Sequence, residues 1–83
     1  MLKTHPTMRI RVEGHTDSRG TPAENMRLSR ARADAVRAFL INRGVAPGRV
    51  VAEGFGSEQP IETNKTTAGR EKNQRIEFVI LQP

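Results

Sequence analysis

Two charged residues that lie far apart in the sequence, Asp17 and Arg32, have the chemistry to bind a zwitterion. Asp17 lies in the polar stretch GHTDSRG, and Arg32 lies in NMRLSRARADAVRAFL, which has a helical pattern of apolar residues. A carboxylate accepts hydrogen bonds from an ammonium group, and a guanidinium can hold a carboxylate through two parallel hydrogen bonds. We therefore treat these two residues as a candidate binding pair.

Arg32 is an unusual residue for its position on the expected helix. An unpaired buried charge costs several kcal/mol, so a half-buried guanidinium must find a partner or extend to water. Asn25 and Ser29 precede it and add an amide and a hydroxyl along one edge. The alternatives to an open site are an internal ion pair between Asp17 and Arg32, or an Arg32 that points to water. At roughly 100° per residue, Arg32 shares one apolar stripe with Leu28, Ala31, Ala35, Val36 and Phe39.

The other polar motifs give weaker signals. Arg70, Asn73 and Arg75 in AGREKNQRIEF either add donors to an anion site or belong to a solvated helix and an edge strand. The histidines lack metal-ligand spacing, and no Ser or Cys in a nucleophile elbow accompanies His15 and Asp17. We therefore expect no metal site, no cofactor and no enzymatic reaction.

A strand and a long helix are expected to position Asp17 and Arg32. Residues 8–13 alternate apolar and charged side chains, which predicts a half-buried strand. The helix should run from about residue 22 to Arg43, because TPAE supplies an N-terminal capping signature and Gly44 a left-handed C-terminal cap. The alternation in the strand places three side chains inward: Met8, Ile10 and Val12.

The rest of the chain adds two strands separated by turn residues. Residues 49–54 predict a second strand, parallel to the first because a helix joins the two. We interpret GHTDSRG as a loop. We interpret the glycines of EGFG as turn residues. The expected C-terminal elements are a helical turn near residues 67–72 and a strand at 75–81 with Ile76, Phe78 and Ile80 on one face.

Composition limits the possible functions. The 83 residues suffice for one domain, and the excess of 14 basic over 9 acidic residues gives a charge of +5, which favours anionic partners. There is no cysteine, no apolar run long enough to span a membrane and no signal-peptide core at the start of the chain. Nucleic acid is disfavoured, because Asp34 interrupts the arginines on the outer helix face and no aromatic residue lies among them.

Several motifs together resemble the C-terminal OmpA-like domain, a family that includes the peptidoglycan-associated lipoprotein and MotB-type stator domains. GHTDSRG, the N-x-x-L-S-x-x-R-A run, EGFG and GREKNQRIEF occur in the family's order over about residues 8–80. The resemblance implies an α/β sandwich (α+β) with a mixed sheet and helices packed on one face. The chain opens abruptly on LKTHPTM, so we expect a single domain over residues 1–83 that lacks the first strand and most of the first helix of the family.

The resemblance also implies a ligand. Family members bind peptidoglycan non-covalently at the periplasmic face of the outer membrane in Gram-negative bacteria, and so anchor the outer membrane or an envelope complex to the cell wall. The aspartate and arginine that hold the ammonium and carboxylate of meso-diaminopimelate in the stem peptide correspond to Asp17 and Arg32. The other residues of the implied site are Thr16, Asn25, Leu28, Arg70, Asn73 and Arg75.

The chain departs from the family pattern in two places. Gln74 stands where the family has the first of two arginines, which removes one possible anion contact. A missing first strand would expose a sheet edge and invite a homodimer through that edge. The alternative functions are a basic nucleic-acid-binding module and a purely structural interaction module.

Overall fold

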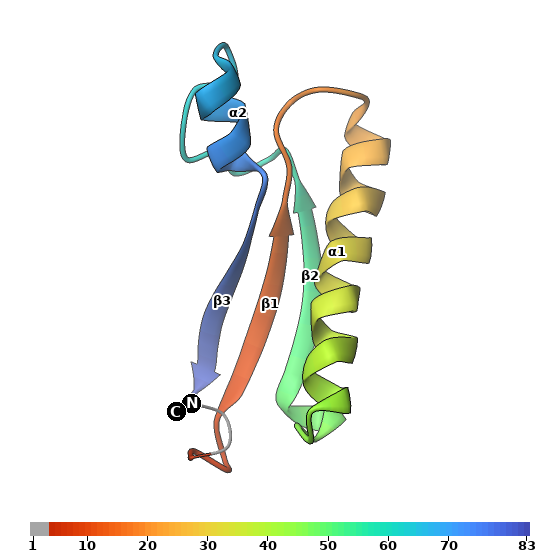
Figure 1. The fold of residues 1–83 in the computed structure, drawn as a ribbon, viewed down its shortest axis with the longest axis vertical. Helices are drawn as coiled ribbons and strands as arrows, with labels where there is room; N and C mark the ends of the chain where they lie inside the picture. Colours follow the sequence, from red (N-terminus) through yellow and green to blue (C-terminus); the bar gives the residue numbers. More distant parts are fainter. Residues whose placement is uncertain (1–3) are drawn as a thin grey trace.

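The computed structural model describes residues 4–83, which form a three-stranded sheet with a long helix along one face and a short helix at one end (Figure 1). The strand order is β2-β1-β3, with β1 parallel to β2 and antiparallel to β3. The predicted mixed α/β fold and the parallel β1–α1–β2 crossover are therefore confirmed. The elements in chain order are β1 (Arg9–His15), α1 (Pro22–Asn42), the 3-10 turn η1 (Pro47–Arg49), β2 (Val50–Gly56), α2 (Thr67–Asn73) and β3 (Arg75–Gln82).

Helix α1 begins and ends as its capping residues predict. The Thr21 hydroxyl accepts a hydrogen bond of 3.1 Å from the backbone N–H of Glu24, and Pro22 occupies the first helical position. Gly44 follows the helix with a φ of +99°, the left-handed conformation that glycine adopts without strain. Neither helix in the described part of the chain has the length and apolar character of a membrane span.

The core lies between α1 and the face of β1 and β2 that the helix covers. Met8, Ile10 and Val12 are all buried there, as the alternation in β1 predicts. In β3, Phe78 pairs with Val12 and Ile80 with Ile10, so these two side chains lie on the same face, yet each is more than half exposed. The reason is that α1 packs over β1 and β2 and leaves β3 uncovered (Figure 1).

The prediction of the buried face of α1 is wrong. The side chains that face the sheet are Asn25, Ser29 and Ala33, whereas Leu28 and Phe39 are 43% and 54% exposed. Ala31, Arg32 and Ala35 are exposed as well, and of the predicted stripe only Val36, which is partly buried, packs against the core. The predicted apolar stripe therefore lies mostly on the flank of the helix, and the contact face is the more polar row of Asn25, Ser29 and Ala33.

Two glycines on neighbouring strands explain this choice. Gly14 and Gly54 pair across β1 and β2, directly beneath Ser29. A Cβ at Gly14 would collide with the Ser29 carbonyl oxygen, and a Cβ at Gly54 would lie 2.6 Å from the backbone nitrogen of Arg30. The interpretation of these glycines as loop and turn residues is thus wrong, because β1 continues to His15 and β2 to Gly56. They allow the helix backbone to approach the sheet closely.

Candidate functional site

Asp17 lies in the loop that joins β1 to α1, at the carboxyl end of β1 (Figure 1). Three elements hold this loop. The Thr16 N–H donates to the Gly56 carbonyl at 2.8 Å, and the Asn25 amide donates to the Asp17 carbonyl at 3.3 Å. The Ser18 N–H donates to Asn64 Oδ1 at 3.3 Å. Contacts from β2, α1 and the segment before α2 therefore determine where the Asp17 carboxylate points.

The Asp17 side chain is only 3% exposed, and both of its oxygens accept hydrogen bonds. Oδ1 accepts from the backbone N–H of Arg19 at 2.8 Å and from its Nε at 3.1 Å. Oδ2 accepts from the terminal nitrogen of the Arg19 guanidinium at 2.8 Å and from Gln74 Nε2 at 2.6 Å. The carboxylate is thus fully hydrogen-bonded within the chain.

These donors keep Asp17 ionised. The Arg19 guanidinium hydrogen-bonded to Asp17 holds the pKa of that carboxyl well below its usual range, although burial acts in the opposite direction. The Arg19 backbone N–H and the Gln74 amide lower the pKa further. In the same way, the Asp17 carboxylate raises the pKa of Arg19. Asp17 is therefore a constant negative charge at neutral pH.

Arg32 has no such partner. Its side chain is exposed, and within residues 4–83 it forms no hydrogen bond or ion pair. The alternative of an internal Asp17–Arg32 ion pair is therefore wrong, and the guanidinium points to water. Leu28 lies one turn earlier on the same flank of α1, so an exposed apolar side chain adjoins an exposed cation.

The structure separates Arg32 from the other two members of its predicted polar edge. Asn25 and Ser29 are buried at 6% and 0% exposure and use their side chains internally. Ser29 Oγ donates to the Met26 carbonyl and accepts from the Gly56 N–H. Asn25 supports the Asp17 loop and Ser29 supports the end of β2, so both are supporting residues and neither is an open contact.

Both polar atoms of the Asn73 side chain are hydrogen-bonded within the chain. Its Oδ1 accepts from the N–H groups of Ile61 and Glu62, at 2.8 and 2.9 Å. Its Nδ2 donates to the Glu62 carbonyl at 2.9 Å and to Asn64 Oδ1 at 2.8 Å. Because the same Asn64 oxygen also binds the Ser18 N–H, Asn73 is linked to the Asp17 loop through one intermediate side chain.

Arg70 and Arg75 brace the segment between β2 and β3. Arg70 donates to the Asn64 carbonyl and to Thr67 Oγ1, both at 3.1 Å. Arg75 is 14% exposed and pairs with Glu77 at 2.9 Å. Its remaining donors bind the backbone carbonyls of Gln59 and Asn73. These contacts leave Arg75 with little guanidinium surface for an external anion.

Sequence reasoning missed both partners of the Asp17 carboxylate. Arg19 is two residues away in an irregular loop, where no periodicity indicates which side chains meet. Gln74 is 57 residues away and could be noticed only because it departs from the family pattern. Position 74 thus faces an anionic side chain of the protein, so the donor there contacts Asp17 and not a free anion.

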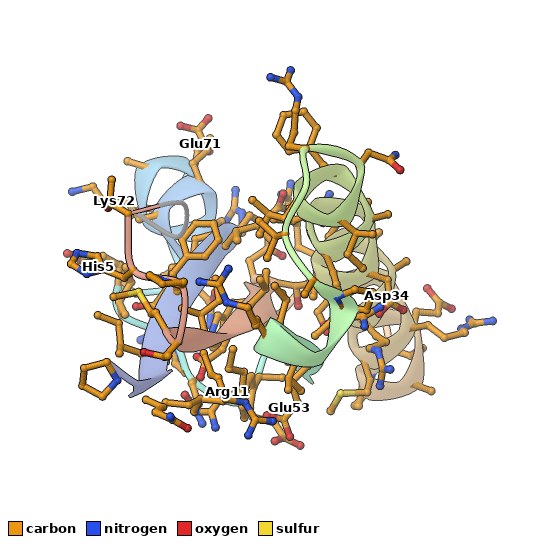
Figure 2. The ribbon with its side chains drawn as sticks, turned by 90° about the horizontal axis from the view of Figure 1, so that it is seen from below. His5, Arg11, Asp34, Glu53, Glu71 and Lys72 are labelled. Carbon is orange, nitrogen blue, oxygen red and sulfur yellow. The ribbon has the colours of Figure 1, made fainter. Side chains whose placement is uncertain are left out.

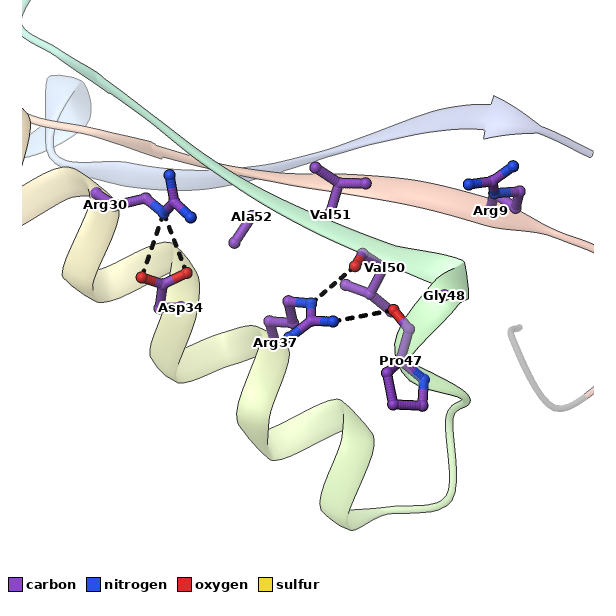
Figure 3. A pocket seen from close by; sticks show the side chains of 9 residues that line it. All are labelled: Arg9, Arg30, Asp34, Arg37, Pro47, Gly48, Val50, Val51 and Ala52. Carbon is purple, nitrogen blue, oxygen red and sulfur yellow. Dashed lines mark hydrogen bonds and ion pairs between the residues drawn. The ribbon is translucent and has the colours of Figure 1, made fainter.

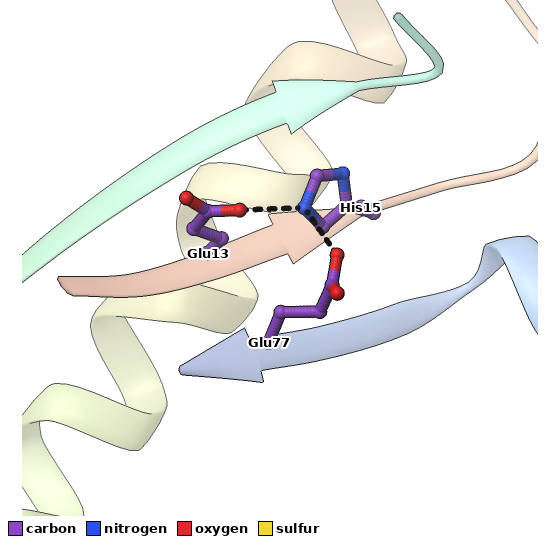
Figure 4. A group of neighbouring side chains, drawn as sticks. All are labelled: Glu13, His15 and Glu77. Atoms are coloured by element: carbon purple, nitrogen blue, oxygen red, sulfur yellow. Dashed lines mark hydrogen bonds and ion pairs between the residues drawn. The ribbon is translucent and has the colours of Figure 1, made fainter. Parts of the chain in front are cut away.

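A second cluster of titratable groups lies on the face of the sheet that α1 does not cover. Figure 2 shows Arg11 and Glu53 projecting from this face, on the side away from the helices. His15 Nε2 lies 3.1 Å from Glu13 Oε1 and 3.3 Å from Glu77 Oε2, and these three residues are drawn in Figure 4. Their ligating atoms lie within 4.8 Å of one another, which is close enough for a metal ion.

The partners of this cluster favour an ion-pair network over a metal site. Arg11 pairs with Glu13 at 2.7 Å, and Arg75 pairs with Glu77 at 2.9 Å, so a metal would compete with two guanidinium groups. Burial acts to raise the pKa of Glu13, but the hydrogen bonds from Arg11 and His15 outweigh it and lower that pKa. The His15 ring also stacks on Phe55 at 5.3 Å. The cluster joins all three strands beneath the Asp17 loop.

A cavity of about 390 Å³ lies between the other flank of α1 and the edge strand β2 (Figure 3). Arg30 and Asp34, which both line this cavity, form an i,i+4 ion pair of 3.1 Å. Arg37 donates to the backbone carbonyls of Val50 and Pro47, at 2.8 and 3.0 Å, and so covers the edge of β2. None of the residues that line this cavity is aromatic, so the groove offers no stacking surface for nucleic-acid bases.

Comparison with known proteins places these features in a family. The sequence model of the OmpA family matches residues 1–74. Outer membrane porin F from Pseudomonas fluorescens is 47% identical over 76 residues, which are 92% of this chain and 23% of the porin. The peptidoglycan-binding protein ArfA from Mycobacterium bovis is 42% identical over 79 residues, which are 95% of this chain and 24% of ArfA. The chain thus spans about a quarter of the length of these two relatives.

The fold agrees with a solved structure in the same group. The crystal structure of the peptidoglycan-associated lipoprotein from Burkholderia pseudomallei superposes with a TM-score of 0.91 at 37% sequence identity. The match covers 95% of this chain and 67% of that chain. The mixed three-stranded sheet with its two helices is therefore the arrangement found in that lipoprotein.

Proposed function

Because the chain belongs to the OmpA family, we propose that it binds peptidoglycan non-covalently and connects an envelope protein to the cell wall. The names of two relatives support this proposal, since ArfA is a peptidoglycan-binding protein and the B. pseudomallei lipoprotein is peptidoglycan-associated. Membership of the family also agrees with the expectation of a binding domain and not an enzyme. The proposed location is the periplasmic side of the outer membrane.

The proposed ligand group is the zwitterionic centre of meso-diaminopimelate in the stem peptide. Asp17 would accept hydrogen bonds from its ammonium, and Arg32 would hold its carboxylate. The observation that carries this assignment is the contrast between the two side chains. Asp17 is a constant anion at neutral pH, whereas Arg32 is an exposed cation without a partner among residues 4–83. Such a cation can engage a ligand carboxylate without first breaking an existing ion pair.

The remaining site residues would act in two ways. Leu28 is exposed beside Arg32 and would pack against the aliphatic part of the diaminopimelate side chain. Thr16, Asn25 and Asn73 are buried, so we assign them the role of holding the Asp17 loop in position. Arg70 and Arg75 would stabilise the segment between β2 and β3, which forms one side of the proposed site, through their hydrogen bonds to its backbone.

Sedimentation with purified peptidoglycan sacculi tests this proposal. Asp17→Ala and Arg32→Ala should remain in the supernatant, whereas the unmodified chain should sediment. Arg30→Ala is the matched control, because Arg30 is an exposed arginine on the opposite flank of α1 and, in the part of the chain that the structure describes, pairs with Asp34 alone. If both site variants still sediment while their folds are intact by circular dichroism, the site assignment is wrong.

The same variants separate the two alternative functions. A nucleic-acid-binding module should lose affinity for a DNA duplex with Arg30→Ala and Arg37→Ala, and its binding should fall steeply with salt. A purely structural module should bind neither sacculi nor DNA. The proposed function predicts sacculus binding that depends on Asp17 and Arg32 and does not depend on Arg30.

A further inference from the structure

Arg19 covers the carboxylate to which the proposed function assigns the ligand ammonium. Its guanidinium uses Nε and one terminal nitrogen against the two oxygens of Asp17, in the bidentate geometry typical of strong arginine–carboxylate pairs. An incoming ammonium would form its hydrogen bonds with the same two oxygens. The position of the ligand cation is therefore already occupied by a cation of the chain.

The donors around Asp17 differ in how readily they could leave. The Arg19 backbone N–H is part of the loop, and Gln74 is neutral, so its hydrogen bond can persist beside a bound ammonium. The Arg19 side chain is 62% exposed, and Asp17 is its only hydrogen-bonding partner among residues 4–83. Moving this side chain into water breaks no other hydrogen bond, and an arriving ammonium restores the local charge balance.

We propose that Arg19 is an internal competitor for the ligand ammonium, so that a diaminopimelate side chain binds Asp17 only by displacing the Arg19 guanidinium. This inference rests on the proposed function. Binding then exchanges one ion pair for another, and the observed affinity equals the intrinsic affinity multiplied by the fraction of molecules in which Arg19 has moved away. Arg19 thereby lowers the observed affinity for the ligand.

The competition predicts a gain of affinity when the guanidinium is removed. If Arg19 covers Asp17 in about 90% of molecules, Arg19→Ala should bind a soluble diaminopimelate-containing muropeptide roughly tenfold more tightly in a calorimetric titration. Arg30→Ala loses the same charge from an exposed ion pair elsewhere and should change the affinity by less than about twofold. A residue that contacts the ligand, or that only orders the loop, would instead weaken binding when it is removed.

Salt dependence gives a second readout. In the unmodified chain Asp17 is paired with Arg19 before binding and with the ligand ammonium after it. The number of ion pairs at Asp17 does not change, so Asp17 should contribute little to the salt dependence of the affinity. In Arg19→Ala the ammonium forms a new ion pair, and the affinity should fall more steeply as salt rises. NMR of the Arg19 Nε–H provides a direct observation, because the signal should move to that of a solvated arginine when the muropeptide is added to the unmodified chain.

Asp17→Ala distinguishes failure of this inference from failure of the proposed function. If the unmodified chain does not bind the muropeptide, the proposed function is wrong. If Asp17→Ala binds the muropeptide as well as the unmodified chain does, the assignment of the ligand ammonium to Asp17 is wrong. If Asp17→Ala loses binding but Arg19→Ala binds no more tightly than the unmodified chain, only the competition is wrong. Arg19→Lys, which keeps the charge without the bidentate fork, should give an intermediate affinity, and it replaces Arg19→Ala if that variant does not fold. An Arg19 Nε–H signal that stays unchanged at saturation would also overturn the competition.

Discussion

Gln74 Nε2 lies 2.6 Å from Asp17 Oδ2, which joins the end of α2 to the loop between β1 and α1 across 57 residues of sequence. This hydrogen bond supports a buried carboxylate, and hydrogen bonds to charged groups contribute more than those between neutral groups. It also connects the two parts of the chain that would form opposite sides of the proposed site. Gln74 therefore stabilises the ionised form of Asp17 even though its own side chain is not charged.

Replacing Gln74 by methionine should lower the free energy of unfolding by about 1 kcal/mol, because the change removes one partly exposed donor to Asp17 and keeps the side-chain length. Urea denaturation measures this value. Gln59→Met is the control, since the Gln59 side chain is exposed and, among residues 4–83, forms no hydrogen bond, while its backbone carbonyl accepts one from Arg75. Equal losses for the two variants would mean that the contact between Gln74 and Asp17 contributes no stability.

The lowered pKa of Asp17 predicts how stability depends on pH. A carboxyl whose pKa is lower in the folded than in the unfolded state stabilises the fold above its unfolded pKa, which is about 3.9. This stabilisation is lost as the pH falls from that value toward the folded pKa. Urea midpoints should therefore fall between pH 5 and pH 2, and they should fall less in Asp17→Asn than in the unmodified chain.

Asp34→Asn is the control for this pH dependence, because the ion pair that Asp34 forms with Arg30 is exposed. It should keep the acid dependence of the unmodified chain. Asp17 itself should also cause no change in muropeptide affinity between pH 8 and pH 5, since it stays ionised throughout that range. If the urea midpoints of Asp17→Asn and of the unmodified chain fall in parallel with pH, Asp17 does not cause the loss of stability in acid.

Local signals predicted most of the fold. The alternation of Met8, Ile10 and Val12 determines the inner face of β1, and Thr21 and Gly44 mark the ends of α1, because each signal depends only on neighbouring residues. The buried face of α1 depends instead on Gly14 and Gly54, which lie on other elements. Helical periodicity alone therefore favoured the more apolar stripe, which is the exposed one.

The residues of the candidate site also fall into those that local sequence signals predicted and those that depend on distant contacts. Asp17 and Arg32 were predicted from their positions after a strand and along a helix. Within residues 4–83 Arg32 has no partner, which an open site requires and which the alternative of an arginine that points to water also predicts. Arg19 and Gln74 could not be identified, because loop conformation and a contact across 57 residues bring them to Asp17. The Glu13–His15–Glu77 cluster was missed because it joins separate strands.

Gly54 should tolerate no side chain. A Cβ there would press against the backbone of Arg30, which cannot move without shifting α1, so Gly54→Ala should lower the free energy of unfolding by roughly 1–3 kcal/mol. Gly48→Ala is the control, since among the described residues no heavy atom beyond Gly48 and its two sequence neighbours lies within 4 Å of a Cβ at that position. It should change stability by no more than about 0.5 kcal/mol in the same thermal or urea measurement. Similar losses for both variants would show that α1 does not contact the sheet at this point.

Asn73 should affect binding through the loop and not by touching the ligand. Asn73→Ala leaves the N–H groups of Ile61 and Glu62 without their acceptor, which should cost about 2–4 kcal/mol of stability. It also releases Asn64, whose oxygen holds the Ser18 N–H.

Amide hydrogen exchange at Ser18 separates these two roles of Asn73. Exchange should accelerate in Asn73→Ala, and muropeptide affinity should fall with it, whereas the exposed Asn42→Ala should change neither. A ligand-contact role predicts instead that affinity falls while Ser18 exchange stays unchanged. The four hydrogen bonds of a fully buried side chain favour the first outcome, because an amide that is already satisfied on both atoms has no donor or acceptor left to offer to peptidoglycan.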